Sequence, residues 1–416
     1  MENKRLKIFV SAYACEPNLG SEKGVGWHWI LEMNKYFELW VMTRADHEND
    51  ISTWMKQYPQ EQEIHFVYYD MPRWTRWWKR GLRGAHLYYI LWQQLSNSLV
   101  KKTMLDNDIE IFHLLTWGNA LWPISPFGQK KFFIWGPTGG IDTIPVEYSC
   151  HYHWRDRMQE AIRRLVIRSL KYNPVFQGQC KNADLILCKA SSIYNTIKPC
   201  YRQKAKLFTD VAVEMKDVEQ MTTQAYNNQE INCIVVGQLD AWRGFDILLE
   251  AFAIAKKEIP VLHLDIIGKG SDGKRISQMI DRLHLENAVS MVGKVSMDEY
   301  LQRMADCDIV LNPSLKEGAV TVAFDSMAFS KPLICIETGG YTNYFNNEYA
   351  IVLERKSRKE TINNLVSALL RMKDKAERDK LGYLSHNKGK EFTWEHKGYA
   401  IRDAIMNAWN NRNDTL

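Results

Sequence analysis

Short apolar runs alternate with longer amphipathic segments along the whole chain. The runs are rich in β-branched and aromatic residues, which is typical of buried parallel strands, and the segments between them repeat apolar residues with a helical period. This alternation predicts βαβ units and therefore an α/β fold. The predicted strands cover residues 6–12, 39–43, 64–69, 109–115, 131–136 and 185–188 in the first half, and residues 232–237, 262–268, 289–293, 308–313, 332–337 and 349–354 in the second.

A polar, aperiodic stretch at residues 223–230 separates the two sets of strands and predicts a domain boundary. At 416 residues the chain also exceeds what one core usually organises. We expect an N-terminal Rossmann-like domain at residues 1–208, a linker at residues 209–230, a second Rossmann-like domain at residues 231–392, and a final helix at residues 393–416 that packs back toward the N-terminal domain. Two parallel-sheet domains facing a central cleft would bind ligands at the carboxyl ends of their strands.

The composition is that of a globular chain, with 45% hydrophobic and 25% charged residues. The apolar run near the N-terminus is too short for a signal peptide, and no stretch reaches the ~18 apolar residues of a transmembrane helix, so we expect a cytoplasmic protein. The net charge of +5 divides unevenly. Residues 1–208 hold 28 basic and 19 acidic residues, whereas the remainder holds 26 basic and 30 acidic residues, so the two halves are expected to face different partners.

The glycine-rich sequence GKGSDG at residues 268–273 fits the dinucleotide fingerprint G-x-G-x-x-G. Taken alone, it indicates a nicotinamide-dependent oxidoreductase. The fingerprint expects an acidic residue at the end of the next strand, where this chain has Gly293 and Lys294, and it belongs on the first strand of a domain rather than the second. We therefore favour a tight strand-to-helix turn and keep the oxidoreductase as an alternative.

A stronger group of residues follows the predicted strand at 308–313. Glu317 and Asp325 are separated by a loop and the start of a helix, so both carboxylates can line one cleft, and free N–H groups at that helix start would suit a diphosphate. Asp325 could then accept hydrogen bonds from sugar hydroxyls, although an exposed helix acid would have the same spacing. Arg243, beside Gly244 at another helix start, suits phosphate oxygens; its alternative is a solvated surface arginine.

The C-terminal half resembles the donor-binding domain of the retaining glycosyltransferases of family 4, which have the GT-B fold and an E-x7-E motif. The resemblance rests on GQLDAWRGFDILLEAF, IIGKGSDGKRI, MVGKV, EGAVTVAFDSMAFSKPLI and ETGG, which occur in that order. The N-terminal half resembles a bacterial polysaccharide branch of the family through YACEPNLGSEKGVGWHW (13–29), the aromatic and basic stretch near 68–80, and FIWGPTGG (133–140).

The resemblance implies a role for each matching residue. Glu317 matches the first acid of the motif, beside the donor sugar, and Asp325 the second, which holds the nucleotide ribose. Arg243 stands in place of a phosphate-binding lysine. The remaining donor-binding positions that it implies are Gln238, Gly268, Lys294, Val295, Gly318, Ala319, Val320 and Thr321.

Three positions depart from the family pattern. Asp325 is one methylene shorter than the usual Glu, and Gln238 replaces an arginine, which leaves more of the charge stabilisation to Arg243. Leu115 occupies the place of the second residue of a histidine pair, so His113 is either catalytic or a packed histidine at a strand end.

The expected reaction is transfer of a sugar from a UDP- or GDP-sugar to a glycan or a polyprenyl-linked acceptor in capsule, exopolysaccharide or lipopolysaccharide synthesis. The resemblance implies retention of anomeric configuration, with the leaving phosphate helping to deprotonate the acceptor. A D-x-D sequence at residues 106–108 is typical of a turn, so we expect no essential metal and no cofactor. The glycine-rich loop with Gly20, Gly24 and Gly26, together with Gly139 and Gly140, is expected to approach the acceptor or the donor phosphate.

A basic and aromatic stretch carries much of the N-terminal charge. Such a composition suits an anionic membrane surface, which would place the protein at the inner face of the cytoplasmic membrane. Tryptophans packed in a helical subdomain are the alternative, and no nucleic-acid-binding module is recognisable. A non-catalytic membrane-binding protein on a degenerate transferase fold also remains an alternative function. The residues of this predicted membrane patch are Arg73, Trp74, Arg76, Trp77, Trp78, Lys79 and Arg80.

Overall fold

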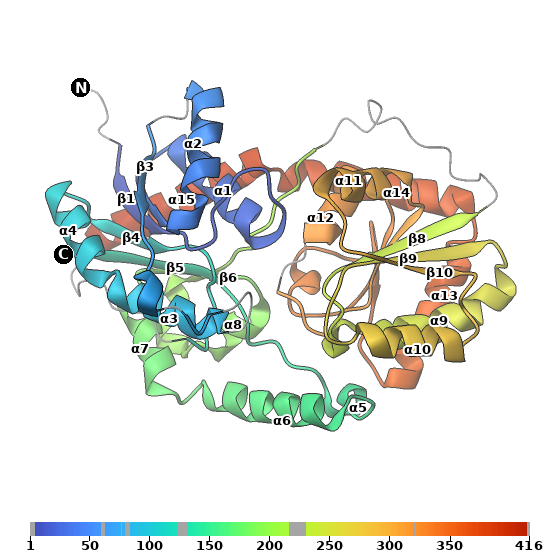
Figure 1. Ribbon diagram of the computed structural model, residues 1–416. Helices are drawn as coiled ribbons and strands as arrows, with labels where there is room; N and C mark the ends of the chain where they lie inside the picture. Colours follow the sequence, from blue (N-terminus) through green and yellow to red (C-terminus); the bar gives the residue numbers. More distant parts are fainter. Residues whose placement is uncertain are drawn as a thin grey trace. The chain divides into compact units, whose positions relative to one another are not determined.

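The computed structural model describes residues 5–59, 63–75, 77–79, 84–122, 131–215, 230–318 and 321–413. The chain forms two compact units (Figure 1). The first contains Met1–Ile141, Ile167–Asp210 and Trp394–Leu416, and the second contains Asp142–Val166 and Val211–Thr393. Among the described helices, none is both long enough and apolar enough to cross a membrane.

The first unit is built on a parallel sheet with the strand order β3-β2-β1-β4-β5-β6-β7. Its central strands β1 and β4 are buried except for Lys7 at the start of β1, which explains their nearly continuous apolar sequences. Helix α1 packs against α15, the last helix of the chain. The strands are β1 (Lys7–Ser11), β2 (Glu38–Thr43), β3 (His65–Tyr68), β4 (Ile111–Leu114), β5 (Phe132–Thr138), β6 (Leu185–Cys188) and β7 (Ala205–Leu207).

The helices of this unit follow the strands as the periodicity predicts. Asn173 caps α7 by accepting hydrogen bonds from the N–H groups of Val175 and Phe176, and proline follows it at the first helical position. The helices are α1 (Ser21–Asn34), α2 (Glu48–Gln57), α3 (Ala85–Leu95), α4 (Asn97–Asp106), α7 (Pro174–Asn182), α8 (Ser191–Thr196) and α15 (Trp394–Asn413).

The second unit has a parallel sheet with the order β10-β9-β8-β11-β12-β13. Figure 1 shows α9 and α10 below this sheet and α11, α12 and α14 above it; α9 also packs against α13. A capping box between Ser357 and Glu360 begins α13. The strands are β8 (Ile231–Val236), β9 (Leu262–Ile267), β10 (Val289–Gly293), β11 (Ile309–Asn312), β12 (Leu333–Ile336) and β13 (Ile351–Leu353); the helices are α9 (Phe245–Glu258), α10 (Gly273–Arg282), α11 (Met297–Asp306), α12 (Thr321–Ala328), α13 (Arg358–Arg371) and α14 (Lys375–Gly389).

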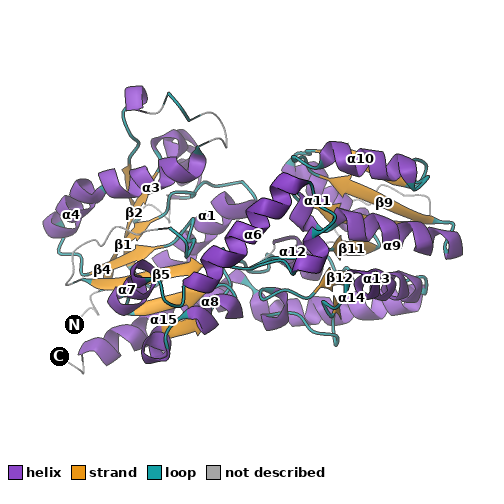
Figure 2. Cartoon of the chain, turned by 90° about the horizontal axis from the view of Figure 1, so that it is seen from below, coloured by secondary structure: helices purple, strands orange, loops and turns teal. Residues whose placement is uncertain are grey.

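Asp142–Val166 belongs to the second unit. The sequence analysis predicted that these residues are part of the N-terminal domain. The segment contains α5 (Val146–Ser149) and most of α6 (Trp154–Ser169), which Figure 2 shows from below. Ile144, Tyr148 and Tyr152 are buried in the core of the second unit, and the Tyr148 hydroxyl lies 2.7 Å from Thr361 Oγ1. These contacts explain why the segment stays with the second sheet although it precedes β6 in sequence.

Candidate functional site

Both sheets have a point at which the direction of strand addition reverses. In the second unit it lies between β8 and β11, which are adjacent in the sheet although two βα units separate them in sequence. Loops beyond the carboxyl ends of such strands diverge and leave a crevice, the usual ligand site of this architecture. The loop after β8 carries Gln238 and Arg243, and the loop after β11 carries Glu317 and Gly318.

Glu317 is held firmly in the loop after β11. Its carboxylate is ion-paired with Arg243 and accepts a hydrogen bond from Ser314 Oγ at 3.0 Å, and its side chain is only 10% exposed. Its backbone carbonyl accepts hydrogen bonds from Gly340 N at 3.0 Å and from Thr338 Oγ1 at 3.1 Å. Burial raises the pKa of Glu317, and the positive charge of Arg243 opposes that rise.

Arg243 reaches Glu317 from a short 3-10 turn, Ala241–Arg243, just before α9. Its guanidinium carbon stands 4.3 Å from the ring centroid of Trp242, so the cation is stacked as well as ion-paired. Its Nε is buried and has no hydrogen-bond partner among the described residues. The hydroxyl of the neighbouring Tyr341 is also buried and has no partner in that part of the chain. Buried polar groups of proteins are usually hydrogen-bonded, so these two atoms are candidates for contact with a polar ligand.

Glycines allow these loops to pack closely. Gly244 has a φ of +70°, and a Cβ there would lie 2.2 Å from the Pro313 carbonyl oxygen. A Cβ on Gly340 would lie 2.3 Å from the Gly318 carbonyl oxygen. Side chains at these positions would push apart the loops that hold Arg243 and Glu317.

Two of the three glycines of the 268–273 sequence have a packing role. Gly268 has a φ of +145°, and a Cβ there would lie 1.8 Å from the Gly237 carbonyl oxygen; a Cβ on Gly270 would lie 2.3 Å from the Leu239 carbonyl oxygen. This turn is therefore pressed against the loop after β8. The geometry accounts for both glycines by close packing and requires no dinucleotide.

The other predicted donor-binding residues are spread over three loops and α12. Asp325, on α12, accepts a hydrogen bond from the Tyr300 hydroxyl. Gln238 and Lys294 are exposed, and Val295 is half-buried; Lys294 and Val295 follow β10, whose last carbonyl, at Gly293, accepts a 2.8 Å hydrogen bond from Gly268 N. Thr321 begins α12, while Ala319 and Val320 lie outside the described residues.

The predicted glycine loop of the first unit is partly helical. Gly20 immediately precedes α1, whereas Gly24 and Gly26 lie within that helix, so the prediction that all three glycines lie in one loop was wrong. Cβ atoms on Gly24 and Gly26 would lie 1.7 Å from the Leu19 carbonyl oxygen and 2.1 Å from the Ala14 carbonyl oxygen. Helix α1 can begin at Ser21 because Gly24 and Gly26 allow its surface to pack directly on the loop that follows β1.

Gly139 and Gly140 directly follow β5 and contact the loop that follows β4. Gly139 N donates to the Gly118 carbonyl at 2.8 Å, and Ala120 N donates back to the Gly139 carbonyl at 3.0 Å. Gly140 has a φ of +83°, and a Cβ there would lie 2.8 Å from the Asn119 side chain. The two loops form one tight structure at the carboxyl ends of β4 and β5.

His113 lies within β4, in the centre of the first sheet, and is fully buried. Its Nε2 lies 2.6 Å from the Gly136 carbonyl oxygen, and its ring lies 6.0 Å from that of Trp29. Burial lowers the pKa of His113 to about 4. The geometry matches the packed histidine that the sequence left open as one alternative.

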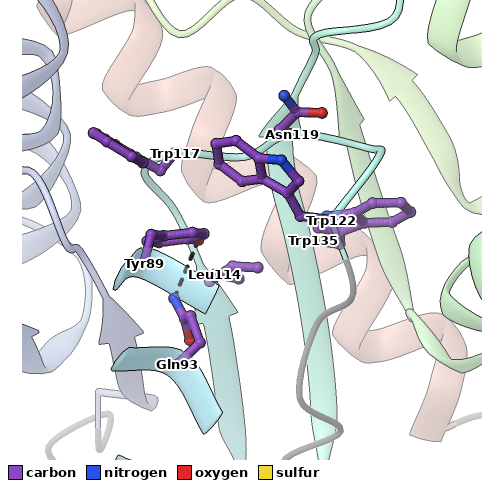
Figure 3. Close-up of a pocket in the computed structure, with 7 residues that line it drawn as sticks. All are labelled: Tyr89, Gln93, Leu114, Trp117, Asn119, Trp122 and Trp135. Atoms are coloured by element: carbon purple, nitrogen blue, oxygen red, sulfur yellow. Dashed lines mark hydrogen bonds between the residues drawn. The ribbon is translucent and has the colours of Figure 1, made fainter. Parts of the chain in front are cut away.

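An aromatic pocket lies beyond the carboxyl end of β4 (Figure 3). The rings of Trp117 and Trp122 lie 5.4 and 5.3 Å from that of Tyr89. Two polar atoms on buried lining residues have no partner in the part of the chain that the structure describes: the indole N–H of Trp135 and the amide oxygen of Gln93. The lining residues are Tyr89, Gln93, Leu114, Trp117, Asn119, Trp122 and Trp135.

The sequence of the second unit is similar to a known protein family. Residues 219–384, which include Arg243, Glu317 and Asp325, match the family model described as "Glycosyl transferases group 1". The match supports a group 1 glycosyltransferase.

Each of the following curated relatives aligns with this chain over only part of its own length. An uncharacterized glycosyltransferase of Methanocaldococcus jannaschii is 28% identical over 236 residues, or 56% of this chain and 62% of that protein. The N-acetylgalactosamine-N,N'-diacetylbacillosaminyl-diphospho-undecaprenol 4-alpha-N-acetylgalactosaminyltransferase of Campylobacter jejuni is 25% identical over 43% of this chain and 46% of that protein. The chain thus spans less than two thirds of either curated relative.

Solved structures show the fold over nearly the whole chain. The crystal structure of Anabaena HepE in complex with UDP and glucose aligns with 97% of this chain and 100% of that protein, with a TM-score of 0.58 and 15% identity. The two parallel-sheet units are thus Rossmann-like domains of the GT-B fold.

Three residues near the candidate sites of the two units were not found by the sequence analysis. Tyr300 binds Asp325, and Tyr341 lies beside the Arg243–Glu317 pair. Glu22 accepts a hydrogen bond from Trp117 N at 2.8 Å and so supports the pocket. Tyr341 directly follows the ETGG turn, which is a usable signal; Tyr300 and Glu22 act across long sequence separations that no local pattern shows.

The predicted membrane patch is described only in part. Trp74 and Trp77 are 79% and 78% exposed, whereas Trp78 packs on Tyr88 and donates its indole N–H to the Thr75 carbonyl. Lys79 Nζ lies 4.2 Å from the ring centroid of Tyr88. Arg76, Arg80 and the side chain of Arg73 lie outside the described residues.

Proposed function

We propose that the protein transfers a sugar from a nucleotide-sugar donor to a glycan or lipid-linked glycan acceptor. The observation that carries the proposal is the ion pair of Arg243 with Glu317 at the β8–β11 reversal point, in which the buried Nε of Arg243 has no partner among the described residues. The group 1 match over the same residues supports it.

The donor is proposed to be a UDP- or GDP-sugar bound by the second unit. Arg243 would bind the diphosphate together with backbone N–H groups between Gly318 and Thr321 at the start of α12. Asp325 would hold the ribose, and Lys294 with Val295 would contact the base. HepE has been crystallised with UDP and glucose, which supports a uridine donor.

The chemistry follows from where charge develops. The leaving diphosphate gains negative charge while the sugar becomes oxocarbenium-like, and fixed positive groups beside the phosphates lower the barrier. Arg243 and the α12 N-terminus are proposed to supply that charge, and Glu317 to face the donor sugar. In a retaining mechanism the leaving phosphate itself takes the acceptor's proton, so no separate base is needed. No step of the proposed reaction uses a metal. Residues 106–108 lie at the end of α4 and in the segment between α4 and β4.

The acceptor is proposed to use the aromatic pocket of the first unit. Trp117 and Trp122 offer faces on which the apolar side of a sugar ring can pack. Trp135 Nε1–H is a buried donor and Gln93 Oε1 a buried acceptor, each without a partner among the described residues, and polar groups of an acceptor could bind to them.

The wider setting is proposed to be bacterial cell-surface polysaccharide synthesis at the inner face of the cytoplasmic membrane. The exposed indoles of Trp74 and Trp77 support contact with lipid headgroups. The resemblance to an enzyme named for a diphospho-undecaprenol substrate supports a lipid-linked acceptor.

Thermal shift with UDP, GDP, ADP and NADH tests the proposal directly, because a ligand that binds only the native state raises its melting temperature. We expect a rise with one nucleoside diphosphate, followed by hydrolysis or transfer from the matching nucleotide sugar. A response to NADH alone would instead favour the oxidoreductase. No response to any nucleotide would favour the non-catalytic binding protein.

A further inference from the structure

Helix α6 has its polar face turned inward. Glu160 is buried and forms an ion pair with Lys316, in the loop after β11. Arg163 Nε donates to the Asp142 carbonyl at 3.2 Å, and Arg164 Nη1 donates to the Ile144 carbonyl at 3.0 Å. Charged side chains thus make the contacts that apolar residues of a surface helix normally make.

The apolar residues of α6 point to the solvent instead. Trp154, Met158, Ile162 and Leu165 are 58%, 51%, 57% and 70% exposed. Their spacing of four, four and three residues aligns them in one stripe along the helix. The helix can be followed in Figure 2. An apolar stripe of this length in water carries a cost that an apolar partner would remove.

The charges on α6 identify the chemistry of that partner. Arg155 and Arg157 are exposed beside the stripe, and Arg168 is exposed in the last turn. Both acidic residues of the helix lie away from the stripe: Glu160 is buried and Asp156 is half-buried. The guanidinium of Arg155 lies 5.4 Å from the ring centroid of Trp154, which places an indole and a cation together at one end. Apolar residues bordered by arginines complement an anionic lipid surface, whereas a second copy of the same helix would bring arginines together.

We propose that the outward face of α6 lies in the interface of an anionic lipid bilayer, with its apolar stripe among the acyl chains and its arginines at the phosphates. The inference builds on the membrane association proposed above but assigns it to a different element, with its own observation. It accounts for the inverted polarity of α6, because the inward charges fix the helix to the second unit and leave the apolar face free for lipid.

The experiment measures co-sedimentation of the full chain with phosphatidylcholine vesicles that contain or lack phosphatidylglycerol. The test variant is Leu165→Glu, and the matched control is Leu105→Glu, since Leu105 on α4 is also 70% exposed. We expect Leu165→Glu to weaken binding to the anionic vesicles roughly tenfold or more, because one leucine leaves the acyl region and a negative charge enters it. The control should bind like the wild type.

A second pair of variants tests the charge. Arg157→Gln should weaken binding to anionic vesicles, while Arg282→Gln, an exposed helical arginine elsewhere, should not. Equal binding by the Leu165 and Leu105 variants, or equal binding of the wild type to vesicles with and without phosphatidylglycerol, would overturn the proposal. A loss of self-association on gel filtration in Leu165→Glu would instead show a protein interface and also overturn it. Melting of the same variants with UDP reports donor binding separately, so failure of the proposed function can be told from failure of this one.

Discussion

The two units have the same sheet order around their reversal points but surround those points with different chemistry. Between β8 and β11 the loops bring together an arginine, a buried carboxylate and close-packed glycines. In the first unit the reversal point lies between β1 and β4. The pocket beyond the end of β4 brings together aromatic rings and two uncharged polar groups that have no partner among the described residues. A shared topology thus supplies a crevice, and the loop residues decide whether it suits an anion or a neutral polyol.

The comparison also explains why overall charge is a poor guide to the ligand. The basic half of the sequence contains the uncharged aromatic pocket, while the acidic half contains the proposed diphosphate site. In the proposed site the stacked Arg243 would act locally, where burial strengthens its electrostatic field. Basic residues of the first half are concentrated elsewhere in the sequence, for example near residues 73–80.

Glu317→Ala should have the largest effect. Without the carboxylate, Arg243 loses its partner and the proposed contact to the donor sugar disappears, so we expect transfer to fall by at least about 100-fold. Initial rates with saturating donor measure the loss. Glu258→Ala, at the exposed end of α9, is the matched control and should leave the rate unchanged. Near wild-type transfer by a folded Glu317→Ala protein would remove this residue from the site.

Arg243→Ala should weaken nucleoside-diphosphate binding by roughly 10- to 100-fold, the value of a charge-assisted hydrogen bond. Titration calorimetry with UDP or GDP measures it, and Arg282→Ala is the control. We also expect the pKa of Glu317 to rise further in Arg243→Ala, because the positive charge that opposes the rise is gone. Unchanged affinity would assign the diphosphate to the backbone donors alone.

Trp122→Ala should raise the KM for acceptor roughly tenfold and leave the affinity for UDP unchanged, because the ring lines the pocket of the first unit only. Trp54→Ala, which removes a half-buried tryptophan on α2, is the matched control. An equal effect of both substitutions would point to general loosening of the unit. A loss of UDP affinity in Trp122→Ala would contradict the separation of the two crevices by chemistry.

The fold could be predicted from local pattern because buried parallel strands carry continuous apolar runs. All twelve predicted strands are present, and β7 escaped because it is three residues long and mostly exposed. The proximity of Arg243 to Glu317 could also be predicted, because both residues follow strands of one parallel sheet, whose carboxyl ends lie at the same edge. The start of α1 was not, because glycines that permit close packing resemble loop glycines in sequence.

Other parts of the site depend on contacts between distant residues. The Tyr300–Asp325 hydrogen bond, the unpaired groups of Trp135 and Gln93, and the inverted polarity of α6 appear only when side chains are placed in three dimensions. The helical period of α6 predicts an amphipathic helix correctly but not which face is turned outward. That direction was set by Glu160, whose partner Lys316 is far along the chain.

His113→Gln should have the smallest effect on transfer, because the buried imidazole contacts a backbone carbonyl and the glutamine Nε2 can replace that donor. Its effect should appear in stability. The pKa of His113 is lowered to about 4 from 6.5. As the pH falls between these two values, the imidazole is protonated in the unfolded chain but stays neutral in the folded protein. The wild type should therefore lose about 2 kcal/mol of unfolding free energy relative to His113→Gln between pH 7 and pH 5.

Urea unfolding of both proteins at the two pH values measures this difference, and His47, whose pKa is also lowered to about 4, contributes equally to both and cancels. A pH-independent difference together with a large loss of transfer would show that His113 meets the substrate, and would make the crevice of the first unit a charged catalytic site like that of the second. Retained transfer with the predicted acid sensitivity would keep the two crevices distinct, one built for charge and one for aromatic packing.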